Sequence, residues 1–395
     1  MRHLQKEDLA LIFASAGWFL VLSGRYAIST LLVHIEASFH MDHAVAGTAL
    51  TAMWFFYGLM QFPSGILSDV KGRKLTITLA MLTFAVAYLL IGISVHVLMF
   101  VAVLVMLGVG AGSFPTAGIA MLSDLFKENR GRALGIQSSV GSMAGLMPIL
   151  APLIAVYNWR FFFVGWAAVS LTCAYLTFAL VPETTRLPSR VSVGERLKDG
   201  LSVFREGETL FIFAINLTVT ITWMGFTSFY PTYLIEGKGF AELEAGICFA
   251  LLSFGGFVLK PVVGSLADRY PPRYIVFGLS SMAATATALL VYTPAFPVAL
   301  ALSLPLSATT SIFLVNNAYL MHHWEVRGRG GKLGFYRSVT ILVGSPTSAL
   351  VGYAAHRYGF DLPFALLAAL LALAATALLA YMEVQRRRRR REVPA

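Results

Sequence analysis

The sequence predicts an all-α integral membrane protein whose twelve transmembrane helices form two six-helix pseudo-symmetric bundles. Its composition is the first reason: 57% of the 395 residues are hydrophobic and only 13% are charged, which leaves too few charges for a surface that faces water. The second reason is a series of apolar runs of roughly 20 residues, the length that crosses a hydrocarbon core. The third is an internal repeat that relates the two halves of the chain.

Apolar runs between charged or turn-forming breaks define the expected spans. They lack the alternation of barrel strands, so helices are the remaining way to satisfy the backbone inside lipid. The first run is too long and too polar in its middle for a cleaved signal peptide. The expected spans are 9–35, 44–67, 75–95, 97–122, 133–155, 161–181, 209–235, 243–267, 274–293, 296–321, 331–354 and 362–383.

Lysine and arginine are concentrated in every second loop, and this predicts the orientation of the chain. If the N-terminus is cytoplasmic, the inner segments hold most of the 30 basic residues, whereas the outer loops hold Arg160, Lys238 and Arg357. Both termini are therefore predicted to be cytoplasmic, in a plasma membrane. The net charge of +10 then reflects orientation and attraction to membrane lipids, and no nucleic-acid partner is expected.

The chain repeats itself at an offset of 199 residues, since residues 65–69 match residues 264–268 and Gly145 matches Gly344. Because six spans is an even number, the second copy has the same orientation as the first, as in a parallel repeat. The predicted units are an N-terminal bundle at 1–181, a cytoplasmic linker at 182–208, a C-terminal bundle at 209–385 and a basic cytoplasmic tail at 386–395. Two such bundles can rock about a site between them, which predicts transport by alternating access.

The loop after the second span carries a distinctive pattern of glycines, an acid and basic residues: Gly65, Asp69, Gly72, Arg73 and Lys74. This pattern resembles the loop signature of the major facilitator superfamily. The resemblance implies a gate at the cytoplasmic mouth, in which Arg73 links Asp69 to an acid at the end of the fourth span, Asp124. The alternative is a basic cytoplasmic loop with no gating role.

The second copy keeps part of this pattern, in Gly264, Asp268 and Arg269. Two prolines, Pro271 and Pro272, replace its Gly-Arg end, so a weaker latch is expected there.

A second resemblance narrows the expected cargo. Phe114-Pro115 and the segment 125–135 resemble the anion:cation symporters and oxalate exchangers of the same superfamily. The fifth span lacks the full drug-antiporter signature, because Leu146 stands where that signature has a proline after Gly145. The resemblance thus implies an anion transporter, and a proton-coupled exporter of drugs or metabolites is the alternative.

Three ionisable residues fall inside the expected spans, and all are basic: Arg25, Lys260 and Arg337. Charges inside lipid cost several kcal/mol and usually serve binding or conduction. A cavity with fixed positive charge and no carboxylate favours an anion, which a guanidinium can hold bidentately. We therefore expect a small carboxylate as substrate. The alternatives are a structural arginine at 25 and side chains at 260 and 337 that extend to the membrane surface.

Polar side chains on other spans are expected to complete the substrate site or to bridge helices. These candidates are Tyr57, Gln61, Gln137, Asn216, Asn316 and Tyr336. Trp54 is interpreted as a packing residue. His34, at the outer end of the first span, is the candidate for proton coupling because imidazole titrates near neutral pH. The alternative is that His34 only lies at the membrane interface, in which case transport would be uniport or anion exchange.

Together these features predict a secondary active transporter, or symporter, for a small organic anion. A membrane-bound enzyme or sensor would need a catalytic motif or a soluble domain, and the sequence shows neither, so no enzymatic activity is expected. No cofactor and no metal are expected, and the protein is expected to be a monomer. Its partners would be the anionic substrate, a proton or another coupling ion, and membrane lipids.

Overall fold

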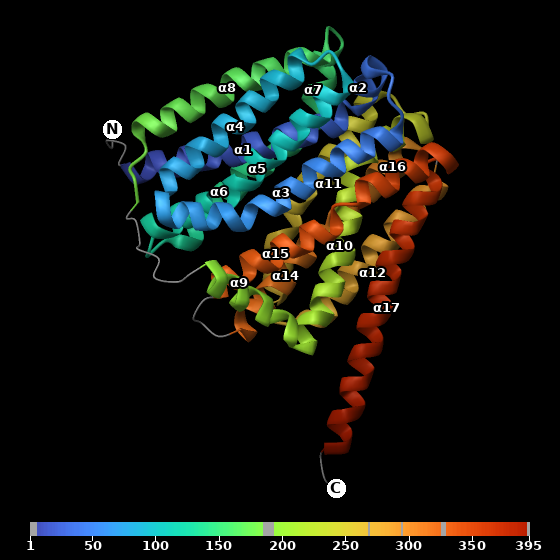
Figure 1. Ribbon diagram of the computed structural model, residues 1–395. Coiled ribbons are helices and arrows are strands. Elements are labelled where there is room, and N and C mark those ends of the chain that lie inside the picture. Colours follow the sequence, from blue (N-terminus) through green and yellow to red (C-terminus); the bar gives the residue numbers. More distant parts are fainter. Residues whose placement is uncertain (1–5, 185–192, 268, 294, 325–328, 393–395) are drawn as a thin grey trace.

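The computed structural model describes residues 6–184, 193–267, 269–293, 295–324 and 329–392, and within these ranges the regular structure is entirely helical (Figure 1). The helices of the first half are α1 (Lys6–Thr30), α2 (Leu32–Phe39), α3 (His43–Lys71), α4 (Arg73–Ile93), α5 (Val97–Leu125), α6 (Arg130–Ser142), η1 (Met143–Leu146), α7 (Met147–Ala155) and α8 (Trp159–Leu180). Those that follow are α9 (Val193–Ser202), η2 (Val203–Arg205), α10 (Gly207–Thr232), η3 (Tyr233–Gly237), α11 (Glu242–Ala267), α12 (Pro272–Tyr292), α13 (Phe296–Leu306), α14 (Ala308–His323), α15 (Arg329–Gly344), α16 (Thr347–Tyr358) and α17 (Asp361–Glu392).

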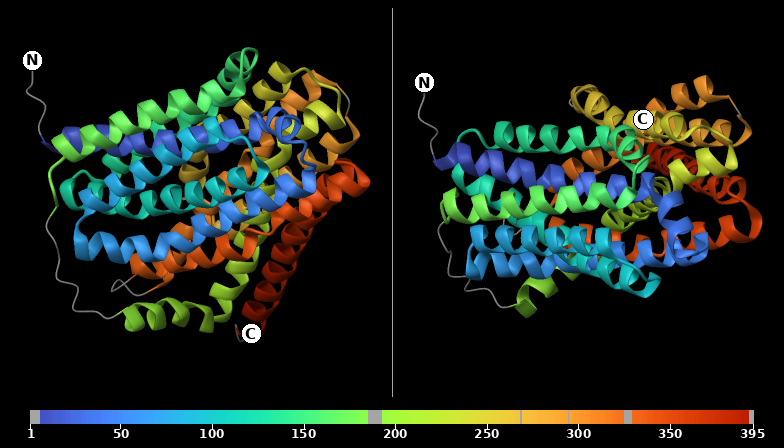
Figure 2. Two further views of the ribbon diagram at one scale, coloured as in Figure 1. Left: turned by 45° about the horizontal axis from the view of Figure 1, so that its top comes forward. Right: turned by 90° about the horizontal axis from the view of Figure 1, so that it is seen from above.

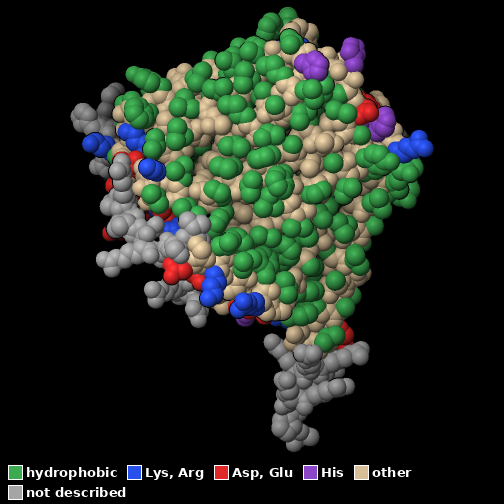
Figure 3. Space-filling view, in the orientation of Figure 1, with side chains coloured by type: hydrophobic (Ala, Val, Ile, Leu, Met, Phe, Trp, Pro, Cys, Tyr) green, Lys and Arg blue, Asp and Glu red, His purple; other side chains and the backbone are tan. Residues whose placement is uncertain are grey.

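Among the described residues, eleven helical segments are long and apolar enough to cross a membrane, and they correspond to eleven of the expected spans. The remaining expected span, 44–67, is the 29-residue helix α3, which is long enough but is not in that set. Hydrophobic side chains cover most of the face shown in Figure 3, and the charged side chains lie mainly at its margins. This distribution suits a protein surrounded by lipid, and the chain is a multi-pass membrane protein.

The helices of the first half pack chiefly on one another, as do those of the second half. In the first half α5 lies against α3 and α4, and α8 lies against α4. In the second half α12 packs on α17 and α14, and α11 packs on α13. The two sets meet where α3 contacts α15 and α16, and where α11 contacts η1 and α7. Figure 2 shows the first set, from blue to green, gathered on one side of the second.

Two ends of the molecule are distinguished by helix α3. Its N-terminus, capped by the Asp42 side chain that accepts a hydrogen bond from the Val45 amide, defines the His43 end. Its C-terminus defines the Asp69 end, where Gly72 separates α3 from α4 with a φ of 104°, a conformation that favours glycine. Gly72 therefore provides a tight turn between α3 and α4.

The two halves approach most closely toward the His43 end. A Cβ atom at Gly47 would lie 2.3 Å from the Ser348 carbonyl oxygen, and one at Gly246 would lie 2.3 Å from the Pro148 carbonyl oxygen. Gly47 and Gly246 are themselves 199 residues apart, the offset of the repeat, as are Ser29 and Ser228, whose hydroxyl and carbonyl oxygen are 3.3 Å apart. The repeat is thus expressed as matched contacts between the halves.

Toward the Asp69 end, three glycines of the interface helices have empty space where a side chain would begin. Cβ atoms at Gly135, Gly264 and Gly334 would meet no atom within 4 Å. Among the described glycines, the shortest contacts between the backbones of the two halves therefore lie toward the His43 end, whereas the Phe62 and Phe335 rings meet at 5.5 Å toward the Asp69 end.

The segment between the two halves contains structure of its own. Within the predicted linker 182–208, helix α9 packs on α15, and a Cβ at Gly200 would touch the Phe335 ring. At the other extreme of the chain, α17 continues through the arginine run to Glu392 and extends beyond the neighbouring helices (Figure 1).

Candidate functional site

Arg25 lies in the middle of the helical bundle, against two aromatic rings of α3. Its guanidinium carbon is 4.0 Å from the centre of the Trp54 ring and 5.0 Å from that of Tyr57. The two rings are three positions apart on α3, so they share one helix face, and they contact each other edge to face at 5.6 Å. Trp54, interpreted from sequence as a packing residue, is thus the platform on which the arginine rests.

The positive charge of Arg25 has no counter-ion in the described part of the chain. The described ion pairs lie at helix ends, and Arg25 takes part in none of them. Its Nε atom is buried and lacks a hydrogen-bond partner. Stacking on aromatic rings contributes about 0.5–2 kcal/mol, which is less than the several kcal/mol that such a charge costs inside a membrane. The site can therefore stabilise an anion that supplies the missing partner.

Residues adjacent to Arg25 on α1 and to Tyr57 on α3 extend this region. Tyr26, the next residue on α1, packs edge to face against Phe249 of α11 at 5.6 Å. Gln61 lies one turn beyond Tyr57 on α3, and its buried Nε2 has no hydrogen-bond partner. The region of Arg25 therefore borders the second half through Tyr26, and an unpartnered amide donor lies one turn along α3 from Tyr57.

Three of the predicted polar residues instead form a network of their own. Asn216 donates to the Tyr336 hydroxyl at 2.9 Å, and Asn316 donates to the Asn216 side-chain oxygen at 2.8 Å. These bonds join α10, α14 and α15. They occupy donors that the sequence interpretation assigned either to substrate binding or to bridging between helices. Bridging is the role for which the structure provides contacts.

Gln137 and Tyr336 are repeat mates, and they make equivalent contacts. The Gln137 amide lies 3.5 Å from the Ala14 carbonyl oxygen on α1, and the Tyr336 ring packs against Phe213 on α10. Ala14 and Phe213 are also 199 residues apart. The two residues therefore occupy matched positions in the two halves, as the repeat predicts.

Arg337 and Lys260 are half-buried, on α15 and α11. Neither has a hydrogen bond or ion pair with the described residues. Their positions leave both earlier readings open, namely contact with substrate and extension toward the membrane surface.

The predicted gate residues of the first copy meet at the Asp69 end. Arg73 donates to Asp69 at 2.9 Å and to Asp124 at 2.7 Å. Gly65 lies close to α5, since a Cβ there would be 3.1 Å from the Thr116 methyl group. The Glu183 carboxylate accepts a hydrogen bond from the Lys74 amide, which ties the end of the first half to this loop.

The linker helix adds a residue to this cluster that the sequence did not single out. Arg196 of α9 donates to the second Asp69 oxygen at 2.7 Å, so Asp69 joins α3 to a helix that packs on α15. Arg196 had counted only as one of the basic residues of an inner loop. Its pairing depends on how the linker folds back, and no local pattern reveals that.

The second copy of the loop makes no comparable cluster within the described residues. Gly264 has open space around it, and Arg269 is exposed. Asp268, the acid expected in this second loop, lies outside the described residues.

We expect Arg196→Gln to lower the population of molecules whose halves are apart at the Asp69 end, because the Arg196–Asp69 pair is formed while the close contacts of the halves lie at the other end. The pair is about one quarter exposed, so it contributes up to roughly 1 kcal/mol, and its loss would change the population of the open state by up to about fivefold. Reactivity of a cysteine placed at Gly334 would measure this opening. Arg205→Gln, which removes a linker arginine without an ion pair among the described residues, is the control and should leave reactivity unchanged; an equal change in both variants would contradict the assignment.

At the His43 end, histidines pair with carboxylates across the interface. His34, the predicted coupling residue, lies 3.0 Å from Glu242 on α11. His43, at the start of α3, contacts Glu36 and Glu236. The sequence interpretation assigned no partner to either glutamate and did not single out His43.

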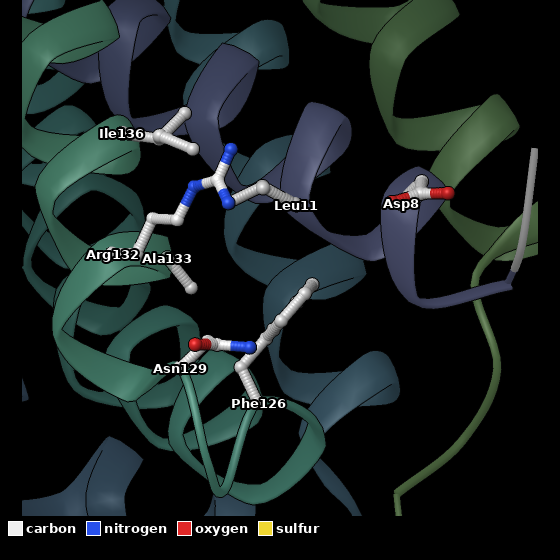
Figure 4. A pocket seen from close by; sticks show the side chains of 7 residues that line it. All are labelled: Asp8, Leu11, Phe126, Asn129, Arg132, Ala133 and Ile136. Atoms are coloured by element: carbon white, nitrogen blue, oxygen red, sulfur yellow. The ribbon is translucent and has the colours of Figure 1, made fainter.

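A separate cavity of about 290 Å³ opens at the Asp69 end, between the first turns of α1 and α6 (Figure 4). In Figure 4, the Arg132 side chain extends toward Leu11 and Ile136. Leu11 precedes Arg25 by nearly four helical turns, so this cavity is distinct from the arginine site.

Comparison with known proteins agrees with this architecture. The sequence model of the Major Facilitator Superfamily matches residues 14–313 and 243–395. Among solved structures, the nucleoside transporter NupG superposes with a TM-score of 0.77 at 15% identity, over 95% of this chain and 98% of the other. An inward-facing bacterial homologue of the human lysosomal transporter Spinster superposes with a TM-score of 0.75 at 16% identity, over 95% and 97% of the two chains.

The fold is therefore that of a membrane transporter. The chain belongs to the Major Facilitator Superfamily, as the loop signature implied.

Its curated relatives include two kinds of transporter. A probable sulfoacetate transporter SauU of Cupriavidus necator is 26% identical, over 91% of this chain and 90% of the relative. A D-galactonate transporter of Escherichia coli is 23% identical over 62% and 63%. The multidrug resistance protein MdtG of Proteus mirabilis is 24% identical over 93% of both chains.

Proposed function

We propose that the protein is a secondary active transporter that moves a small organic anion, a carboxylate, across the plasma membrane. The observation that carries this proposal is Arg25, a guanidinium inside the bundle that stacks on Trp54 and Tyr57 and has no carboxylate partner among the described residues. A carboxylate can accept two parallel hydrogen bonds from a guanidinium, which gives both affinity and orientation.

In this proposal the cargo's negative charge compensates Arg25 at the mid-membrane site. Gln61 supplies an additional donor, and the aromatic rings exclude water around the pair, so the electrostatic interaction is strengthened. Names of relatives support this class of cargo, because sulfoacetate and galactonate are organic anions.

Transport would proceed by alternating access between two six-helix bundles, 1–181 and 209–385, both with cytoplasmic termini. Matched glycine contacts at Gly47 and Gly246 close the His43 end, whereas Cβ atoms at Gly135 and Gly334 would meet no described atom within 4 Å. With the Asp69 end cytoplasmic, this arrangement corresponds to access from the cytoplasm. The cluster of Asp69, Arg73 and Asp124 would then rearrange when that side closes.

We further propose that transport is coupled to protons. The described part of the site offers no carboxylate to carry the proton, so it would move with the substrate or on an imidazole such as His34. A proton-coupled exporter of drugs or metabolites is the second candidate, favoured by the MdtG relative and by the aromatic rings at the site.

Uptake by proteoliposomes that contain the purified protein tests the proposal. Labelled small carboxylates should accumulate when the outside is made acidic, and sugars, amines and cationic dyes should not compete. Accumulation or competition by amines and dyes without any effect of carboxylates would contradict the anion assignment and favour the exporter. Carboxylate uptake that ignores the pH gradient would contradict proton coupling only.

A further inference from the structure

The His43 side chain joins the two halves of the protein through both of its ring nitrogens. Nδ1 lies 3.1 Å from each carboxylate oxygen of Glu36, which is on α2. Nε2 lies 3.1 Å from a carboxylate oxygen of Glu236, which is on η3 in the second half. An imidazole can donate from both nitrogens only when it is protonated, so this geometry fits an imidazolium between two carboxylates.

The surroundings of this bridge concentrate negative charge on it. Glu36 is only 7% exposed, whereas His43 and Glu236 are 19% and 37% exposed, so solvent at the His43 end reaches the ring. Asp42, the cap of α3, acts on Glu36 from the N-terminal side and lies 3.7 Å from His356 of α16.

Other groups at this end are engaged elsewhere. Lys238, just after η3, is bonded to Asp361 at 2.9 Å, and His34 is bonded to Glu242. Apolar rings cover the remaining sides of His43: Phe360 lies 4.9 Å away and Phe229 lies 6.4 Å away.

We propose that Glu36, His43 and Glu236 form a proton-binding site whose occupancy holds the His43 end of the transporter closed. This inference rests on the alternating-access part of the proposed function and is independent of which substrate is carried. Because the site is reached by solvent from the His43 end, it reports the pH on that side of the membrane.

The titration behaviour of the cluster supports this site. Burial by itself lowers the pKa of His43, but hydrogen bonds to Glu236 and Glu36 outweigh it and raise the pKa to about 10. Burial raises the pKa of Glu36, and the hydrogen bond from His43 offsets part of that effect. The His43 imidazolium therefore counteracts the effect of burial on Glu36.

The direction of the pH effect follows from the linkage between proton binding at His43 and closure of the His43 end. Separation of the halves removes Glu236 but leaves Glu36, which is in the same half as His43, so the pKa of His43 falls only part of the way toward its ordinary value of about 6.5. The closed state thus binds the proton more tightly than the open one, and its advantage is complete below the open-state pKa of His43. Above that value the ratio of open to closed molecules should rise by up to tenfold per pH unit, until the closed-state pKa is reached.

One ligand atom from each of these three residues lies within 4.8 Å of the others, but a metal ion could bind there only if the present hydrogen bonds were broken. To share one cation, both carboxylates would have to meet it at the same imidazole nitrogen, whereas here they lie at opposite nitrogens. A bridging proton is therefore the better occupant.

Distance measurements by electron paramagnetic resonance on the full-length protein in liposomes test the proposal. Spin labels at Ala37→Cys and Tyr358→Cys, with both native cysteines replaced by alanine, report the separation of the halves at the His43 end. In the labelled protein that keeps Glu36, His43 and Glu236, the population with the longer label–label distance should grow between pH 6.5 and 9. His43→Gln and Glu236→Gln should both flatten this dependence, and His40→Asn, an exposed control at the same end, should preserve it.

Three results would overturn the proposal. These are a distance distribution that does not change with pH, a pH slope that survives in both His43→Gln and Glu236→Gln, or a closed population that depends on added Zn²⁺ and is lost with a chelator. Carboxylate uptake measured on the same samples separates the two proposals. If carboxylate uptake fails but the distance distribution still changes with pH, the proposed cargo is contradicted and the proposed proton-binding site is not.

Discussion

Replacement of Arg25 by alanine should abolish saturable uptake of the carboxylate substrate. Truncating one partner of a desolvated charge pair typically costs 2–5 kcal/mol, which corresponds to an increase in Kd of about 30-fold or more. Arg25→Lys keeps the charge but loses the planar fork and the stacking on Trp54, so it should restore only part of the affinity. Initial uptake rates in proteoliposomes over a range of substrate concentrations would measure both effects.

The chain offers a matched control for this substitution. Arg160 also stacks on a tryptophan, with its guanidinium 4.4 Å from the Trp159 ring, but it already donates to the Ser94 carbonyl oxygen at the His43 end. Arg160→Ala should therefore leave the substrate concentration dependence unchanged. Normal uptake by Arg25→Ala, or an equal rise in KM in both variants, would remove the reason to assign an anionic cargo.

Gly47→Ala should open the His43 end and stop transport. The new Cβ would lie 2.3 Å from the Ser348 carbonyl oxygen, and because backbone cannot move aside locally, the halves must separate by about 1 Å. Overpacking of this kind costs about 1–3 kcal/mol, so we expect a lower thermal midpoint together with the loss of uptake. Melting of the purified protein in detergent and uptake in liposomes measure the two effects.

Two further glycines make this prediction specific. Gly246→Ala, the repeat mate, should behave like Gly47→Ala because its Cβ would meet the Pro148 carbonyl oxygen at the same distance. Gly165→Ala on α8 meets no atom within 4 Å and should leave the midpoint equal or slightly higher, since alanine favours helix. If Gly47→Ala matched Gly165→Ala in both assays, the close contact would not be required for the transport cycle.

Much of the architecture could be predicted from local features of the sequence. Hydropathy gave the helices, and the loop signature, through its resemblance to the major facilitator superfamily, implied the meeting of Asp69, Arg73 and Asp124. These features depend on neighbouring residues or on a repeat, so they are visible in the chain itself. Arg25 was also visible, because a lone charge within an apolar run is conspicuous.

Contacts between distant segments could not be predicted in the same way. His43 and Glu236, or Asp69 and Arg196, meet only because the two halves and the linker dock in one particular way. The network of Asn216, Asn316 and Tyr336 illustrates the same limit: their polarity was evident, but their preference for one another over a ligand depends on the distances between α10, α14 and α15.

The central claim is that the Arg25 guanidinium binds the negative charge of the cargo. Calorimetric titration of the purified protein and of Arg25→Ala, each with a transported carboxylate and with its uncharged amide, tests this claim most directly. The unsubstituted protein should bind the carboxylate about 30-fold or more tightly than the amide, and Arg25→Ala should bind the two about equally. If Arg25→Ala keeps the full preference for the carboxylate, the charge is recognised elsewhere and the claim is wrong.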